Sequence, residues 1–116
     1  MKVKRESYIE AELVRRVLAA GGVCEKVTVI GTRGFYDRLV VLPGNRVFFV
    51  ECKRPQGGRL SPHQMQRHAR YRALGAAVAL VLNTADIDRL INAKGRDAGD
   101  VAALHVNPSP PLETGR

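Results

Sequence analysis

The stretch GFYDRLVVLPGNRVFFVECKRP, residues 34–55, carries the strongest fold signal in the chain. Its two apolar runs, FYDRLVVL and RVFFVECK, are separated by the tight-turn sequence PGN, and this pattern predicts a β-hairpin. Charged side chains are costly inside a core unless they are paired or bind a metal. Asp37 nevertheless lies in the first run, and Glu51 and Lys53 close the second. These charges therefore point to a function beyond folding.

Around this hairpin the sequence predicts an α/β domain whose central sheet is flanked by helices. The expected elements are a helix over 6–22, strands over 23–30, 35–42 and 46–53, a helix over 61–75, a strand over 76–83 and a helix over 84–93. The second helix is expected to begin at Ser61 as N-cap with Pro62 in its first turn, and to end at Gly75. Thr84 is expected to cap the last helix. The helix between the third and fourth strands permits a parallel pairing, which would make the sheet mixed.

Composition indicates a basic, single-domain protein. The 116 residues contain 19 Lys plus Arg and 11 Asp plus Glu, a net charge of +8 that favours nucleic acid first and an anionic membrane surface second. A merely soluble basic protein is the alternative. No long apolar segment predicts a membrane span, the N-terminus does not resemble a secretory signal, and Cys24 and Cys52 are expected to be buried reduced thiols. We therefore expect a cytoplasmic domain over 1–106 with a loose proline-rich tail over 107–116.

The hairpin residues suggest a metal site. Alternate residues of a strand share a face, so Glu51 and Lys53 point the same way, and pairing through the turn would place Asp37 across from them. Two carboxylates with main-chain and water oxygens suit Mg²⁺ or Mn²⁺, and a nearby lysine can position or activate a water molecule. The alternative is an ordinary ion pair on a surface hairpin, because a short D…ExK pattern alone is weak.

The first helix adds a further acid. Glu10 lies on the apolar face formed by Leu13, Val14 and Val17, where a solvated helix would not place a carboxylate. A metal centre or Lys53 would supply the partner that such a carboxylate needs. Alternatively, Glu10 lies at a fraying helix end and reaches water.

Three segments together resemble a VRR-Nuc domain, a compact nuclease of the PD-(D/E)xK, restriction-endonuclease-like superfamily. They are ESYIEAELVRRVLAAGG, GFYDRLVVLPGNRVFFVECKRPQGGRLSPHQ and RALGAAVALV, and the resemblance runs from about Glu6 to Leu82. The ordered combination of helix glutamate, G-x-x-D, E-x-K and LSPHQ is specific, although each part alone is weak. One departure is Tyr36, which occupies the position before the aspartate where the family usually has proline.

The resemblance implies a metal site made by Asp37, Glu51 and the main-chain carbonyl of Cys52. It makes Lys53 the catalytic lysine of E-x-K. The restriction-endonuclease-like fold that it implies has the α-β-β-β-α-β-α order predicted above.

The resemblance also assigns Glu10 as the helix acid, with Glu6 as a second candidate, and places Gln64 near the active site. Capping of the second helix through Ser61 is the alternative role for Gln64. His63 and His68 are spaced five residues apart and have no metal-binding neighbours, so we expect them at the surface or on phosphate. His105 receives no role.

Basic residues near these motifs predict a rim for a phosphate backbone: Arg33, Arg54, Arg59, Arg67 and Arg70. A solvated helix face is the alternative for some of them. Aromatic residues are few and tryptophan is absent, which favours shape and backbone recognition of duplex or branched DNA over base stacking.

The expected function is therefore a Mg²⁺- or Mn²⁺-dependent DNA endonuclease. The stand-alone members of the family suggest a Holliday-junction-resolvase-like homodimer in a bacterial or phage-infected cell. A non-catalytic nucleic-acid-binding module, or a nuclease acting on flaps, plain duplex or RNA, is the alternative.

Overall fold

The computed structural model describes residues 5–93. These residues form three helices and a four-stranded sheet. The elements are α1 (Glu6–Ala19), β1 (Val23–Lys26), β2 (Arg38–Leu42), β3 (Arg46–Cys52), α2 (Pro62–Ala73), β4 (Val78–Val81) and α3 (Thr84–Asn92). Their order confirms the α/β fold class predicted from the sequence. The predicted end of the domain at residue 106, the 107–116 tail and His105 lie outside the described residues.

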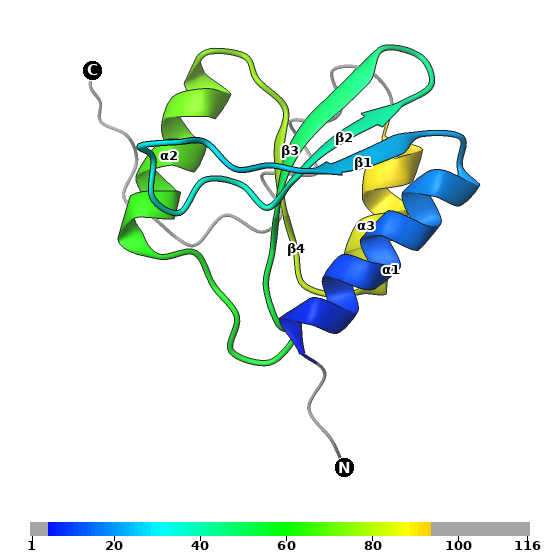
Figure 1. The fold of residues 1–116 in the computed structure, drawn as a ribbon, viewed down its shortest axis with the longest axis horizontal. Helices are drawn as coiled ribbons and strands as arrows, with labels where there is room; N and C mark the ends of the chain where they lie inside the picture. Colours follow the sequence, from blue (N-terminus) through cyan, green and yellow to red (C-terminus); the bar gives the residue numbers. More distant parts are fainter. Residues whose placement is uncertain (1–4, 94–116) are drawn as a thin grey trace.

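The hairpin of β2 and β3 occupies the middle of the sheet (Figure 1). Strand β1 pairs antiparallel with β2, β2 pairs antiparallel with β3, and β3 pairs parallel with β4 through the α2 crossover. Gly44 and Asn45 make the predicted turn with φ angles of 87° and 65°, a region that these two residue types tolerate best. The register opposes Arg38 to Val50, so Asp37, one residue earlier, lies across from Glu51.

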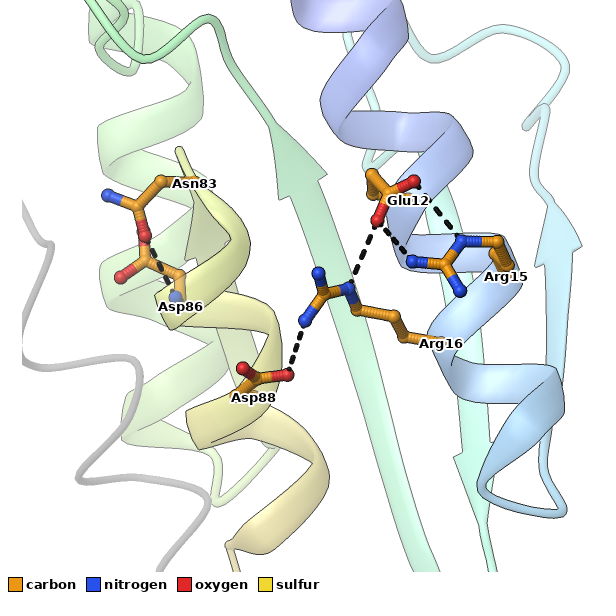
Figure 2. A network of polar contacts seen from close by, with 6 residues as sticks. All are labelled: Glu12, Arg15, Arg16, Asn83, Asp86 and Asp88. Atoms are coloured by element: carbon orange, nitrogen blue, oxygen red, sulfur yellow. Dashed lines mark hydrogen bonds and ion pairs between the residues drawn. The ribbon is translucent and has the colours of Figure 1, made fainter.

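Helices α1 and α3 cover one face of the sheet (Figure 1). Core side chains between the helices and the sheet come from every third or fourth residue of α1 and from every second residue of β3. This spacing is typical of amphipathic helices and strands. The largest members of this core are Ile9, Leu13, Val17, Val40, Leu42, Phe48, Val50, Ile87 and Leu90. Arg16 joins the two helices, because it contacts Glu12 of α1 at 3.1 Å and Asp88 of α3 at 2.9 Å (Figure 2).

Helix α2 covers the other face through a cluster of aromatic rings. Phe35, Tyr36 and Phe49 from the sheet side contact Tyr71 of α2, with ring centroids 5.6–6.1 Å from that of Tyr71. His68 is also buried here, with 1% of its surface exposed, so its predicted surface position is wrong. Helix α2 turns this side chain inward because the Tyr36 hydroxyl hydrogen-bonds His68 Nδ1 over 3.2 Å.

Several elements are shorter than predicted, and contacts in the structure explain one boundary and one helix cap. Strand β1 ends at Lys26 instead of residue 30, and residues 27–37 form a loop that reaches α2 (Figure 1). Arg67 of α2 donates to the Gly34 carbonyl over 2.6 Å. The main chain of this segment is therefore bound by a helix side chain, whereas a strand would be bound by the main chain of a neighbouring strand. Asn83, not Thr84, caps α3, because Asn83 Oδ1 accepts from the Asp86 N–H over 2.9 Å (Figure 2).

None of the helices within residues 5–93 is long and apolar enough to cross a lipid bilayer.

Candidate active site

The hairpin brings Asp37 and Glu51 together at the end of the sheet opposite the turn. The Cys52 main-chain N–H donates to Asp37 Oδ2 over 2.8 Å, which ties the start of β2 to the end of β3. Lys53 Nζ lies 3.5 Å from Glu51 Oε2, as alternation along an extended chain requires. Both carboxylates and the lysine predicted from the sequence therefore gather in one place.

Burial makes this place electrostatically unfavourable for negative charge. Glu51 is 3% exposed, and burial raises the pKa of its carboxyl group to about 8. The charge of Asp37 adds to the rise, whereas Lys53 opposes it. Burial also raises the pKa of Asp37, and the hydrogen bond from the Cys52 N–H offsets this only in part. Two acids that repel each other in this way attract either a proton or a cation.

Gln64 has both of the roles considered for it. Its side-chain oxygen accepts from the Ser61 N–H over 2.9 Å, and its main-chain N–H donates to Ser61 Oγ over 3.2 Å. This reciprocal pair is a capping box at the start of α2. The side-chain Nε2 donates in the opposite direction to Glu51 Oε2 over 2.9 Å. One amide group therefore caps the helix and orients the buried carboxyl group.

The two acids of α1 have different surroundings. Glu10 Oε2 accepts from Arg38 Nε at 2.7 Å and from Lys26 Nζ at 3.1 Å. Burial acts to raise the pKa of Glu10, but these cations outweigh it and the net shift is downward. The pKa of Glu6 is raised, first by partial burial and then by the charge of Asp37, while Lys53 opposes the rise. Glu6 thus shares the field of the hairpin acids, and Glu10 is held by cations of β1 and β2.

Comparisons with known proteins point to one family. The chain is 43% identical over 93 residues to "Putative nuclease p44" of Acyrthosiphon pisum secondary endosymbiont phage 1, across 80% of this chain and 98% of that protein. It also superimposes on a solved structure described as "VRR_NUC domain" with a TM-score of 0.69 and 35% identity, covering 74% of this chain and 92% of the other. The chain belongs to the VRR-Nuc domain family. No general model of a protein family matches the sequence.

Nucleases of the VRR-Nuc family generally depend on a metal ion, so the donors present here matter. Within residues 5–93, no three His, Cys, Asp or Glu side chains stand close enough together to hold a metal by themselves. The donors that lie opposite each other in the hairpin, Asp37 and Glu51, are hard oxygen ligands, and Mg²⁺ usually binds one or two carboxylates and keeps several waters. The donor set therefore fits a hydrated divalent cation.

Cys52 could offer such a cation only its main-chain oxygen. Its side chain is fully buried in the core between the sheet and helices α1 and α3. Burial raises the pKa of the thiol, and nearby carboxylates raise it further, so the metal-binding thiolate is disfavoured.

The basic residues predicted to bind nucleic acid do not form one cluster. Arg67 and Arg70 line an open groove of about 430 Å³ on α2, together with His63 and Gln66. Arg54 follows Lys53 and donates to the Gln56 carbonyl over 2.8 Å. Arg33 lies in the loop before β2, where its carbonyl accepts from Arg67 over 3.3 Å. Arg59 is exposed in the loop before α2.

Sequence reasoning missed the cations that neutralise Glu10 and the hydrogen bond that anchors Tyr36. Strand alternation could have revealed the first, because Arg38 faces the same side as Val40, toward α1. The bond between Tyr36 and His68 had no local signal, because the two residues are far apart in the chain.

Proposed function

We propose that this protein is a metal-dependent DNA endonuclease. The observation that carries the proposal is the placement of half-buried Asp37 opposite buried Glu51 beside Lys53, with the pKa of Glu51 raised to about 8. Such a site is costly for the apo protein and becomes favourable when a divalent cation binds. The similarity to a phage protein named as a nuclease supports the same chemistry.

In this proposal Asp37, Glu51 and the Cys52 carbonyl hold Mg²⁺ or Mn²⁺. The cation would act as a Lewis acid on the phosphate and lower the pKa of the attacking water. Lys53 positions that water and stabilises the extra negative charge on the phosphate. Gln64 keeps the Glu51 carboxylate oriented through its 2.9 Å hydrogen bond.

The two acids of α1 have separate roles in this proposal. Glu6, in the field of Asp37 and Lys53, reaches the site through water. Glu10 supports the site by holding Arg38, the residue next to Asp37, at 2.7 Å. The attacking water loses a proton as its oxygen bonds to phosphorus, the bond from phosphorus to the 3′ oxygen breaks, and that oxygen takes up a proton. The products are a 5′ phosphate and a 3′ hydroxyl.

We propose branched DNA, such as a four-way junction, as the substrate. One domain, taken as residues 1–106, has one such site, so symmetric cleavage of a junction requires two copies and therefore a homodimer. A cytoplasmic setting in a bacterial or phage-infected cell is consistent with the phage origin of the relative. Full junction cleavage by a protein that sediments as a monomer would exclude the homodimer.

The deciding experiment incubates purified protein with labelled four-way junction, flap, linear duplex and single-stranded RNA in Mg²⁺, Mn²⁺ or EDTA. We expect cleavage that requires metal and falls at least a hundredfold in Asp37→Ala, Glu51→Gln and Lys53→Ala. Glu12→Gln is the matched control, because Glu12 is a carboxylate of α1 that pairs with Arg15 and Arg16 outside the site. DNA binding without cleavage, unchanged in Glu51→Gln, would instead indicate a non-catalytic binding module.

A further inference from the structure

Acidic residues are segregated between the two sides of the sheet. The sequence has no Asp or Glu between Glu51 and Asp86, a stretch that contains α2 and β4. The loop residues 27–36, which reach α2, also contain none. Acids of the described residues lie instead on α1, β1, the active end of the hairpin and α3. A polyanion is therefore attracted more strongly to the α2 side, which has no carboxylates to oppose its cations.

The open groove on α2 suits the phosphates of such a polyanion. Its lining residues, His63, Gln66, Arg67 and Arg70, offer hydrogen-bond donors and positive charge, and none is a carboxylate. Arg67 is also the residue that fixes the neighbouring loop, through its bonds to the carbonyls of Gly34 and Arg33. Arg67 therefore connects the groove directly to the loop.

The tip of this loop presents an unusual side chain. Ile30 is 96% exposed, more than the other exposed large apolar side chains within residues 5–93. It sits in a tight turn closed by the bond from the Thr32 N–H to the Val29 carbonyl, with Gly31 at a φ of 83°. Turn centres of this kind normally carry polar residues, glycine or proline. The Ile30 side chain contributes almost no buried area to the fold and is free to contact a ligand.

The loop is held firmly below its tip. The Arg67 guanidinium donates to Gly34 and lies 5.4 Å from the centre of the Phe35 ring, which packs on Tyr36, Phe49 and Tyr71. The loop that carries Ile30 is therefore fixed to α2, the helix that bears the cationic groove.

We propose that Ile30 is a wedge that inserts into an opened base stack while the α2 groove holds the phosphates of the same DNA. Apolar side chains inserted between base steps kink a duplex, and the cost of unstacking is lowest where stacking is already interrupted. Ile30 would thus favour branched over continuous duplex. This inference rests on the proposed function, because it assumes a DNA substrate.

The test compares Ile30→Ser with the wild type on a four-way junction and on a linear duplex of the same sequence. A 2-aminopurine base at the branch point reports unstacking, and EDTA allows this to be measured without cleavage. We expect wild-type protein to raise the fluorescence of the junction and Ile30→Ser to leave it unchanged. In Mg²⁺, the ratio of kcat/KM for junction over duplex should fall about tenfold in Ile30→Ser.

Two further variants keep the test specific. Ile30→Leu preserves an aliphatic side chain and should restore both signals. Leu18→Ser removes an aliphatic side chain that is 57% exposed on α1, on the opposite side of the sheet, and should change neither. Equal melting temperatures would show that all three variants fold.

An unchanged junction preference and an unchanged fluorescence signal in Ile30→Ser would overturn the wedge. The endonuclease proposal would survive that result if Glu51→Gln still abolished cleavage. Conversely, a wild-type protein that unstacks the junction but cleaves nothing in Mg²⁺ or Mn²⁺ would support the wedge and refute the nuclease.

Discussion

At the scale of single residues, the Glu51 carboxyl group is where burial and charge conflict most directly. Its pKa rises from an ordinary value of 4.5 to about 8 in the folded protein. Between these values the folded chain keeps a proton that the unfolded chain has released. The free energy of unfolding of the metal-free protein therefore falls as pH rises through this window, by up to about 1.4 kcal/mol per pH unit.

The first prediction concerns this slope. Glu51→Gln cannot ionise, so in EDTA its unfolding free energy should depend less on pH between about 5 and 8, and it should exceed that of the wild type near pH 8. Urea denaturation at several pH values measures this. Saturating Mg²⁺ should remove the wild-type decline as well. Glu12→Gln is the control, because Glu12, with a pKa of about 2, stays ionised throughout the window. Parallel curves for the wild type and Glu51→Gln would show that Glu51 titrates normally.

The second prediction concerns Tyr36, which takes the place of the usual proline. Tyr36→Phe keeps the buried ring but removes its 3.2 Å hydrogen bond to His68, whose Nε2 already lacks a hydrogen-bond partner among residues 5–93. We expect a loss of about 1–2 kcal/mol in unfolding free energy by urea denaturation. Tyr71→Phe, in the same ring cluster, should cost less because it leaves the pair between Tyr36 and His68 intact. Equal costs would argue that the bond contributes nothing.

At the scale of elements, the first turn of α2 contains a residue that both caps the helix and contacts the candidate active site. Ser61 and Gln64 cap the helix reciprocally, and only Gln64 also contacts Glu51. Stability and activity can therefore be separated by comparing these neighbours.

The third prediction uses that pair. Ser61→Ala and Gln64→Ala each remove part of the capping box and should each lower the unfolding free energy by about 1 kcal/mol. Only Gln64→Ala frees the Glu51 carboxylate, so it alone should reduce kcat for DNA cleavage, by about tenfold. Melting curves and single-turnover cleavage measure the two effects. A similar loss of activity in Ser61→Ala would place the effect in helix position and not in the amide contact.

Turn and capping residues decided which elements could be predicted from the sequence. The PGN turn and the Ser61-Pro62 start of α2 are local chemical signals, and both elements appear where the sequence indicated. The VTVI run, residues 27–30, looks like a strand because it is β-branched, but its segment is held by Arg67, 33 residues away from Gly34. Propensity cannot detect a partner that distant in sequence.

The site shows the same limit. The sequence alone could predict the proximity of Asp37, Glu51 and Lys53, because one hairpin and its register determine their positions. The choice between Glu6 and Glu10 could not be made, because it depends on Arg38 and Lys26, which only the packing of α1 against the sheet places nearby.

At the scale of the whole molecule, the α2 side should dominate electrostatic binding of DNA. The fourth prediction compares Arg70→Ala, in the groove, with Arg15→Ala, on α1 where Arg15 pairs with Glu12 at 2.6 Å. Losing one phosphate contact should weaken DNA binding and reduce the slope of log K against log salt by about 1. Fluorescence anisotropy between low and moderate salt, in EDTA, measures both variants. Equal salt slopes for the two would mean that DNA does not prefer the α2 side.

The turn between β2 and β3 lies at the opposite end of the hairpin from the carboxylates, and Pro43, Gly44 and Asn45 are all exposed. Arg46, just after it, fastens the start of β3 to the Ile91 and Ala93 carbonyls. A short epitope or fluorescent label inserted between Gly44 and Asn45 would thus project into solvent at the end of the hairpin away from Asp37 and Glu51. This position offers a way to follow the protein in living cells without disabling it.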